Sequence, residues 1–170
     1  MDGGDGRVPL ERGVSVPGGG LPDPALRAAF LAARYGTAGS GAFLDRERGG
    51  GPAPDWAGRG WGVVTAWNPA GQPRGRAANE AAQRRLRAAS RWAFREGVNG
   101  EGEWQEPSLI LGGVRLRDVV ALGVAFGQAA VLWGAGQRVA LVWLPASGVE
   151  AARVERWWLR PATAPVTDAR

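Results

Sequence analysis

A small set of polar residues has the types and positions that could support binding or catalysis. They stand near the ends of expected strands and helices, where pockets commonly form: Thr65, Asn68, Asn79, Glu106, Ser108 and Gln128. Glu106 is the candidate general base, with Thr65 or Ser108 as a weak nucleophile, and the amides of Asn68 and Gln128 would orient a substrate. The same residues could instead form a structural clamp, because buried polar groups require hydrogen-bond partners.

Several kinds of chemistry are excluded by residue types that the chain lacks. It contains no Cys, His or Lys, which rules out disulfides, zinc fingers, imidazole catalysis and Schiff-base chemistry. Glu80 and Glu106 could offer oxygen ligands to magnesium, but they match no metal-binding signature. We therefore predict no metal and no cofactor. Amide, hydroxyl and carboxylate groups remain, and these suit recognition or clamping better than proton transfer near neutral pH.

Arginine alone supplies the positive charge, and the formal net charge of the chain is +5 at pH 7. A subset recurs at three- and four-residue spacing and is predicted to line one helix face: Arg84, Arg87, Arg91 and Arg95. Such a face could bind single-stranded nucleic acid, and Arg74 and Arg76 extend the basic zone. The alternative is an ordinary solvated helix face, because no RNA-binding sequence pattern accompanies these arginines.

The helices and strands that position these residues can be predicted from capping residues and from the periodicity of apolar residues. Asp23 is a good N-cap for a helix that starts at Pro24 and ends at Gly36. Alternating apolar residues predict a strand over 61–68. Further helices are predicted over about 76–91 and 115–127, and further strands over 92–94, 108–111, 129–133 and 138–144.

This order of elements predicts a two-layer α+β domain. Strand, helix, strand, strand, helix, strand matches the ferredoxin-like (split βαβ) antiparallel sheet, here with an extra edge strand and an N-terminal helix. We predict a disordered leader over 1–20, one domain over 21–145 and a partly disordered C-terminal extension over 146–170. In this plan the strand that ends near Asn68 neighbours those that begin near Glu106 and Gln128. Their side chains should therefore meet at one polar rim.

Four short segments resemble a known family. They are Thr65-Ala66-Trp67-Asn68-Pro69, Asn79-Glu80, Glu106-Pro107-Ser108 and Phe126-Gly127-Gln128-Ala129, and their order and spacing are similar to those of bacterial domain-of-unknown-function family 3293. The resemblance covers about residues 26–144. It implies a bacterial protein and a fold, but no activity, because the family carries no established one.

The location and the function follow from these features as expectations. The first residues carry acids and glycines where a secretory signal would be apolar, so we expect a cytoplasmic protein. The uncharged stretch 119–137 is interrupted by glycines and reads better as a helix and a buried strand than as a membrane span. We predict a small binding or interaction module using the polar rim. Single-stranded nucleic-acid binding and an enzyme that uses Glu106 are the alternatives.

Overall fold

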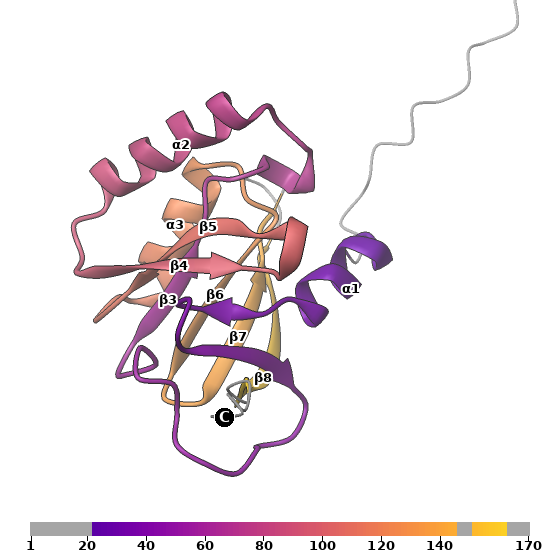
Figure 1. Cartoon of the computed structure of the whole chain (residues 1–170), viewed down its shortest axis with the longest axis vertical. Coiled ribbons are helices and arrows are strands. Elements are labelled where there is room, and N and C mark those ends of the chain that lie inside the picture. Colours follow the sequence, from indigo (N-terminus) through magenta and orange to yellow (C-terminus); the bar gives the residue numbers. More distant parts are fainter. Residues whose placement is uncertain (1–21, 146–150, 163–170) are drawn as a thin grey trace, which may run out of the picture.

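An eight-stranded antiparallel β-barrel forms the centre of the protein in a computed structural model that describes residues 22–145 and 151–162 (Figure 1). Around the barrel the strands follow the order β1, β2, β8, β7, β6, β3, β5, β4, and β4 pairs with β1. The strands are Tyr35–Gly36 (β1), Gly41–Asp45 (β2), Trp61–Val64 (β3), Phe94–Asn99 (β4), Glu106–Leu111 (β5), Ala130–Ala135 (β6), Arg138–Trp143 (β7) and Arg153–Pro161 (β8). The α-helices are Pro24–Ala32 (α1), Arg76–Ala89 (α2) and Leu116–Ala125 (α3), and Pro69–Gly71 (η1) and Gly102–Trp104 (η2) are 3₁₀ turns.

The predicted two-layer ferredoxin-like sheet is wrong, because the sheet has no open edge. The order β4, β5, β3, β6 is present, but β7 continues through β8 and β2 to β1, which returns to β4. Each of these pairings is antiparallel. The physical reason is that an open sheet would leave the edges of β4 and β7 unpaired, and closure satisfies their backbone groups.

Strand β8 supplies much of this closure, although the sequence assigns its residues to a C-terminal extension. Arg153–Pro161 lies between β7 and β2, with Leu159 opposite Leu44 and Trp157 opposite Val139. Trp157 and Leu159 are buried in the barrel interior. Residues 153–161 are therefore part of the folded domain. The leader predicted over 1–20 lies outside the described residues.

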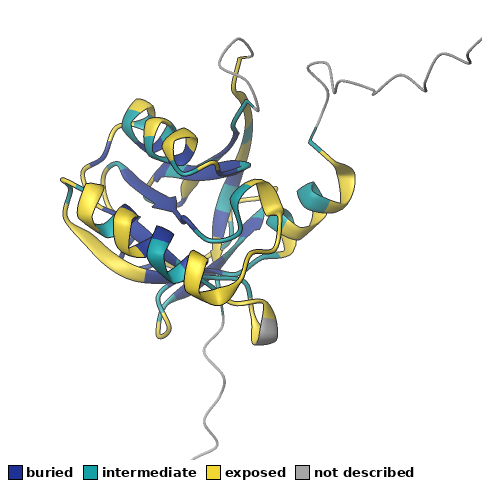
Figure 2. Cartoon of the chain, turned by 90° about the horizontal axis from the view of Figure 1, so that it is seen from above, coloured by how far each residue is buried: buried dark blue, intermediate teal, exposed yellow. Residues whose placement is uncertain are grey.

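Two apolar cores follow from the alternation of side chains along the strands. On β3, Trp61 and Val63 face the barrel interior, while Val64 faces outward. The interior core also contains Leu132 and Leu141. The outer core lies between the barrel wall and α2 and α3, and the helices expose their other faces to solvent (Figure 2). The barrel is therefore a packed core with helices on one part of its outer wall.

Helix α3 packs against β3 at a glycine. A Cβ atom added at Gly62 on β3 would come within 2.5 Å of Val119 Cγ2 on α3. Val119 is fully buried. The glycine therefore lets α3 contact β3 directly, and any larger residue would push the helix outward.

The two ends of the barrel are covered by different segments. At one end α1, capped by Asp23 as predicted, places Phe30 edge-on to Trp143 with ring centroids 5.2 Å apart. At the other end Trp56 contacts Trp61 edge-on, also at 5.2 Å, and its indole nitrogen donates to the carbonyl oxygen of Ser40. In the described part of the chain no helix has both the length and the apolar character needed to cross a bilayer. The cytoplasmic location stays a prediction.

Candidate functional site

The end of β3 and the starts of β5 and α2 meet at the α1 end of the barrel. There Asn68 Nδ2 donates to Glu106 Oε1 at 2.7 Å. Asn68 and Asn79 are joined twice: Asn79 Nδ2 donates to Asn68 Oδ1 at 2.8 Å, and the Asn68 backbone N–H donates to Asn79 Oδ1 at 3.0 Å. We call Asn68, Asn79 and Glu106 the rim cluster. The pairings of β3 with β5 and β6, on which the expected rim depends, are both present.

The rim cluster fixes the loop that leads from β3 into α2. Asn68 has a left-handed backbone (φ 43°, ψ 63°), a conformation that asparagine tolerates better than most residues. Its Oδ1 also accepts from the Arg74 backbone N–H at 3.0 Å, and Asn79 Nδ2 donates to the Arg74 carbonyl oxygen at 3.1 Å. The amide atoms of Asn68 and Asn79 are thus occupied by neighbours within the protein.

Thr65 and Gln128 hold the backbone on either side of Trp67. Thr65 Oγ1 donates to the Pro107 carbonyl oxygen at 2.7 Å and accepts from the Trp67 N–H at 3.0 Å. Gln128 Nε2 donates to the Trp67 carbonyl oxygen at 3.2 Å. The Thr65 hydroxyl proton is directed to a carbonyl, so this hydroxyl is bonded as a clamp. Both residues reach the rim, but as supports of its backbone.

Ser108 is not part of the rim. It is fully buried, and its hydroxyl has no hydrogen-bond partner within the described residues. It lies opposite Gly97 on β4, where an added Cβ atom would come within 2.7 Å of Ser108 Oγ. Ser108 is therefore enclosed in the barrel wall, away from any ligand at the rim.

Glu106 is the titratable group of the rim cluster. Burial raises the pKa of its carboxyl group above the ordinary value, and the hydrogen bond from Asn68 opposes this shift. The pKa of the buried Tyr35 phenol is also raised, mainly by burial and secondarily by the charge of Glu106. Glu80 does not join Glu106, since its Oε1 accepts from Arg76 Nε at 2.8 Å. The two carboxylates considered as magnesium ligands therefore each have a different partner within the protein.

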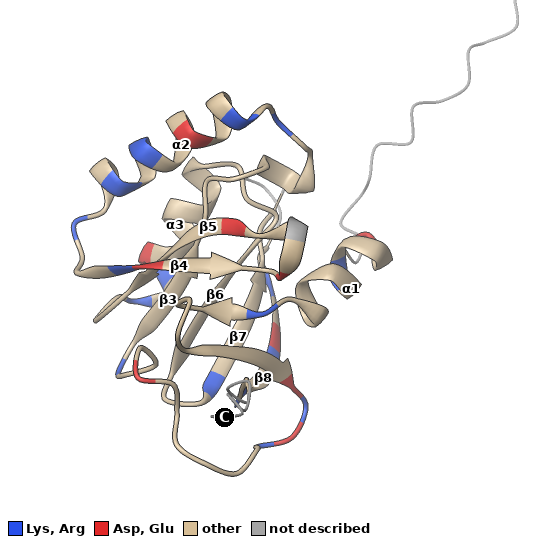
Figure 3. Ribbon diagram, viewed as in Figure 1, with Lys and Arg blue, Asp and Glu red and all other residues tan. Residues whose placement is uncertain are grey.

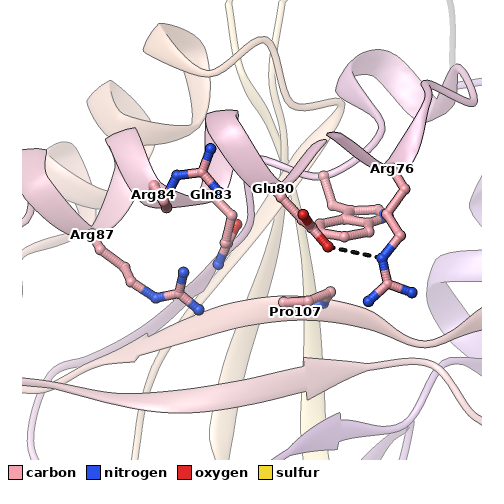
Figure 4. A pocket seen from close by; sticks show the side chains of 7 residues that line it. Arg76, Glu80, Gln83, Arg84, Arg87 and Pro107 are labelled. Carbon is pink, nitrogen blue, oxygen red and sulfur yellow. Dashed lines mark hydrogen bonds and ion pairs between the residues drawn. The ribbon is translucent and has the colours of Figure 1, made fainter. Parts of the chain in front are cut away.

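A pocket of about 300 Å³ lies beside the rim cluster, between α2 and β5 (Figure 4). Residues of α2 form one wall, Pro107 lies on β5, and Trp67 comes from the segment after β3. The lining residues are Trp67, Arg76, Glu80, Gln83, Arg84, Arg87 and Pro107. Its volume is at the lower end of the range of about 300–1,000 Å³ for small-molecule sites.

Gln83 is the most unusual residue of this pocket, and it was not among the predicted site residues. It is 1% exposed, and its Oε1 accepts from the Ala66 N–H at 3.0 Å. This bond sets the orientation of the amide, so Nε2 remains a donor, and Nε2 has no partner within the described residues. The signal for it in the sequence is its position four residues after Asn79, on the core-facing side of α2.

The arginines do not form the predicted four-residue helix face, because α2 ends at Ala89 and the Ser90 backbone is extended. Arg84 and Arg87 lie on α2 (Figure 3). Arg91 follows the helix and lies over the Trp92 ring at 4.7 Å, while Arg95 is on β4 and pairs with Asp55 at 2.6 Å. The physical reason is that the chain must turn back here so that β4 can pair with β5.

Within the pocket the arginines differ in their partners. Arg76 pairs with Glu80 at 2.8 Å, and Arg87 pairs with Glu96 through two hydrogen bonds of 2.7 and 2.9 Å. Arg84 is exposed and has no ion pair among the described residues. It is thus the guanidinium that a bound anion could engage without displacing a carboxylate.

The segment that carries the rim cluster and the pocket matches a family model. Residues 64–131 match the family described as "Protein of unknown function (DUF3293)". The resemblance recognised in the sequence is thereby confirmed at the level of the family. The match runs from the end of β3 into β6, so it contains every residue that lines the pocket. No curated protein and no solved structure matches the chain.

Proposed function

We propose that this protein is a small binding module whose ligand is anionic and occupies the pocket between α2 and β5. The observation that carries the proposal is Gln83, which lines the pocket and whose buried Nε2 has no acceptor within the described residues. An unpaired buried donor is destabilising, and an acceptor on a ligand would satisfy it. Thr65 and the rim cluster form the scaffold of the site: Thr65 bonds to the backbones of Trp67 and Pro107, and the adjacent residues Asn68 and Glu106 bond to each other.

The charge around the pocket supports an anion over a cation. Three of the lining residues are arginines, and one, Glu80, is acidic. Glu80 is already paired with Arg76, which leaves Arg84 free among the described residues. Guanidinium groups bind phosphate and carboxylate through paired N–H donors. The role of Glu106 as a general base stays a prediction, because its contact with Asn68 serves the scaffold equally well.

An NMR titration with inorganic pyrophosphate tests this proposal. We expect saturable shifts of the Gln83 side-chain amide and the Arg84 Nε–Hε resonances. Arg84→Ala should weaken binding by about tenfold, in line with a hydrogen bond to a charged group. Arg85→Ala is the matched control, because Arg85 lies on the same helix, is exposed and does not line the pocket. Shifts that do not saturate, or an equal loss in both variants, would contradict a specific site.

A further inference from the structure

We infer that the ligand of this pocket is a nucleotide within a single-stranded nucleic acid, with its base stacked on Trp67 and its phosphate at Arg84. This inference rests on the proposed function and specifies the class of ligand. Three features carry it: an aromatic wall whose backbone is fixed by hydrogen bonds, a lining amide with an unpaired donor within the described residues, and exposed arginines before, on and after α2.

Hydrogen bonds fix the backbone that carries the aromatic wall. The Trp67 N–H and carbonyl oxygen are both bonded to side chains, those of Thr65 and Gln128, and the next residue belongs to the rim cluster. Trp67 is half-buried, and Pro107 adds a second apolar surface. A nucleobase presents a flat face to such a wall, and stacking on aromatic side chains is a principal means of binding single strands.

The Gln83 amide suits the edge of a base. Its Nε2 is oriented as a donor by the bond between Oε1 and Ala66, and every base carries carbonyl or ring-nitrogen acceptors. In a duplex those edges are paired and the faces are stacked, so only an unpaired base could enter a pocket of about 300 Å³. The combination of stacking wall and edge donor therefore selects a single strand over a duplex.

The arginines extend in both directions from the pocket along α2. Arg74 precedes the helix by two residues, Arg76 and Arg84 lie on it, and Arg91 follows its end; all four are exposed, and α2 carries several basic positions (Figure 3). Arg76 and Arg91 also pair with Glu80 and Asp118, at 2.8 and 3.7 Å. A free mononucleotide would use only the arginine nearest its phosphate. A strand would place successive phosphates along this line, which is why we assign the ligand to a polymer.

Fluorescence anisotropy with a labelled oligoadenylate of about ten nucleotides tests the inference. We expect Trp67→Ala to weaken binding by about tenfold and Trp67→Phe to retain most of the affinity, since phenylalanine also stacks. Trp104→Ala is the matched control, because Trp104 is 84% exposed and lies outside the pocket. Arg84→Ala should lower both the affinity and the slope of its salt dependence more than Arg85→Ala does. Circular dichroism checks that each variant is folded.

Two further arms separate the possible outcomes. Adenosine monophosphate should compete at least about tenfold more weakly than the strand, since it engages fewer arginines; equal affinity would overturn the assignment to a polymer. An equal loss in Arg84→Ala and Arg85→Ala with none in Trp67→Ala would show binding by charge alone and overturn the stacked site. Pyrophosphate binding without oligonucleotide binding would overturn this inference and leave the proposed function standing. Absence of both would overturn both.

Discussion

Asn68 forms hydrogen bonds to more residues at the rim than any other residue described there. Its side chain donates to Glu106 and accepts from Asn79 and from the Arg74 backbone, and its backbone is left-handed. Asparagine combines tolerance of this conformation with both a donor and an acceptor. The clamp interpretation made from the sequence is therefore sufficient to explain Asn68, and the proposed ligand pocket lies beside it.

Substitution of Asn68 should reduce stability markedly. We expect Asn68→Ala to lower the free energy of unfolding by about 2–4 kcal/mol, through unsatisfied partners and the cost of a left-handed alanine. Asn68→Gly removes the same hydrogen bonds, but glycine adopts the left-handed backbone conformation without steric cost. Asn68→Gly should therefore be more stable than Asn68→Ala by about 1 kcal/mol. Urea denaturation measures both. A loss below about 0.5 kcal/mol in Asn68→Ala would argue against the clamp.

Glu106 should make stability depend on pH. Burial raises its pKa in the folded protein, so the folded state binds this proton more tightly than the unfolded chain does. The contribution of Glu106 to the free energy of unfolding should therefore fall as the pH rises from the ordinary glutamate range through the raised pKa. In Glu106→Gln the side chain keeps an oxygen that can accept from Asn68 Nδ2, but it does not titrate. This substitution should therefore remove the decrease in the free energy of unfolding with rising pH.

Denaturation of both proteins over a series of pH values measures the effect. The wild type and Glu106→Gln should converge at acidic pH, where Glu106 is protonated in both states, and Glu106→Gln should be the more stable near neutral pH. The opposite order near neutral pH would show that the charged carboxylate gains more from its surroundings than burial costs it.

At the scale of elements, β8 decides whether the sheet is open or closed. It pairs with β7 and β2, and its inward side chains Trp157 and Leu159 are buried in the interior core. Its sequence shows only a short apolar alternation between polar residues. The number of neighbours a strand has is set by residues far away in the sequence, so this alternation could not reveal that β8 is central to the barrel wall.

A pair of substitutions on β8 tests its place in the barrel. Leu159→Ala should lower the free energy of unfolding by about 2–5 kcal/mol, because Leu159 is fully buried. Val154→Ala on the same strand should change it by less than about 0.5 kcal/mol, because Val154 is 51% exposed. Thermal or urea denaturation provides the comparison. Similar small effects for both would mean that β8 does not belong to the cooperative core.

Helix α2 shows which features of a helix local sequence patterns predict and which they do not. Its start at Arg76 is predicted correctly, and it ends two residues before the expected Arg91. The same spacing of three and four residues was extended to Arg91 and Arg95, which the chain places after the helix and on β4. The spacing of apolar residues reflects the buried face of a helix, but exposed charged residues are under no such constraint. Charged residues therefore identify the end of a helix less well than apolar residues do.

For the whole molecule, the weakest part of the barrel is the short strand β1. Tyr35 and Gly36 alone bridge β2 and β4, whereas β6 and β7 pair along six residues each. Local opening should therefore begin here. In native-state hydrogen exchange, we expect ladder amides of β1 and β2 to exchange through smaller opening energies than those of β5 and β6. Uniform protection around the barrel would contradict a preferred opening seam.

Sequence patterns alone determine where the helices begin, the β6–β7 hairpin, the resemblance to the family and the excluded chemistries, because each depends on neighbouring residues or on residue type. The first helix ends at Ala32 and not at the expected Gly36, which lies in β1. They also predict that Asn68, Asn79 and Glu106 approach one another, since that requires only the local order of β3, α2 and β5. Tertiary structure decides that the sheet closes, that Ser108 is enclosed, and that Trp67, Gln83 and Pro107 line a pocket. These depend on pairings between residues as distant as Asp45 and Trp158, whose free energy comes from burying a shared interior and not from any local preference.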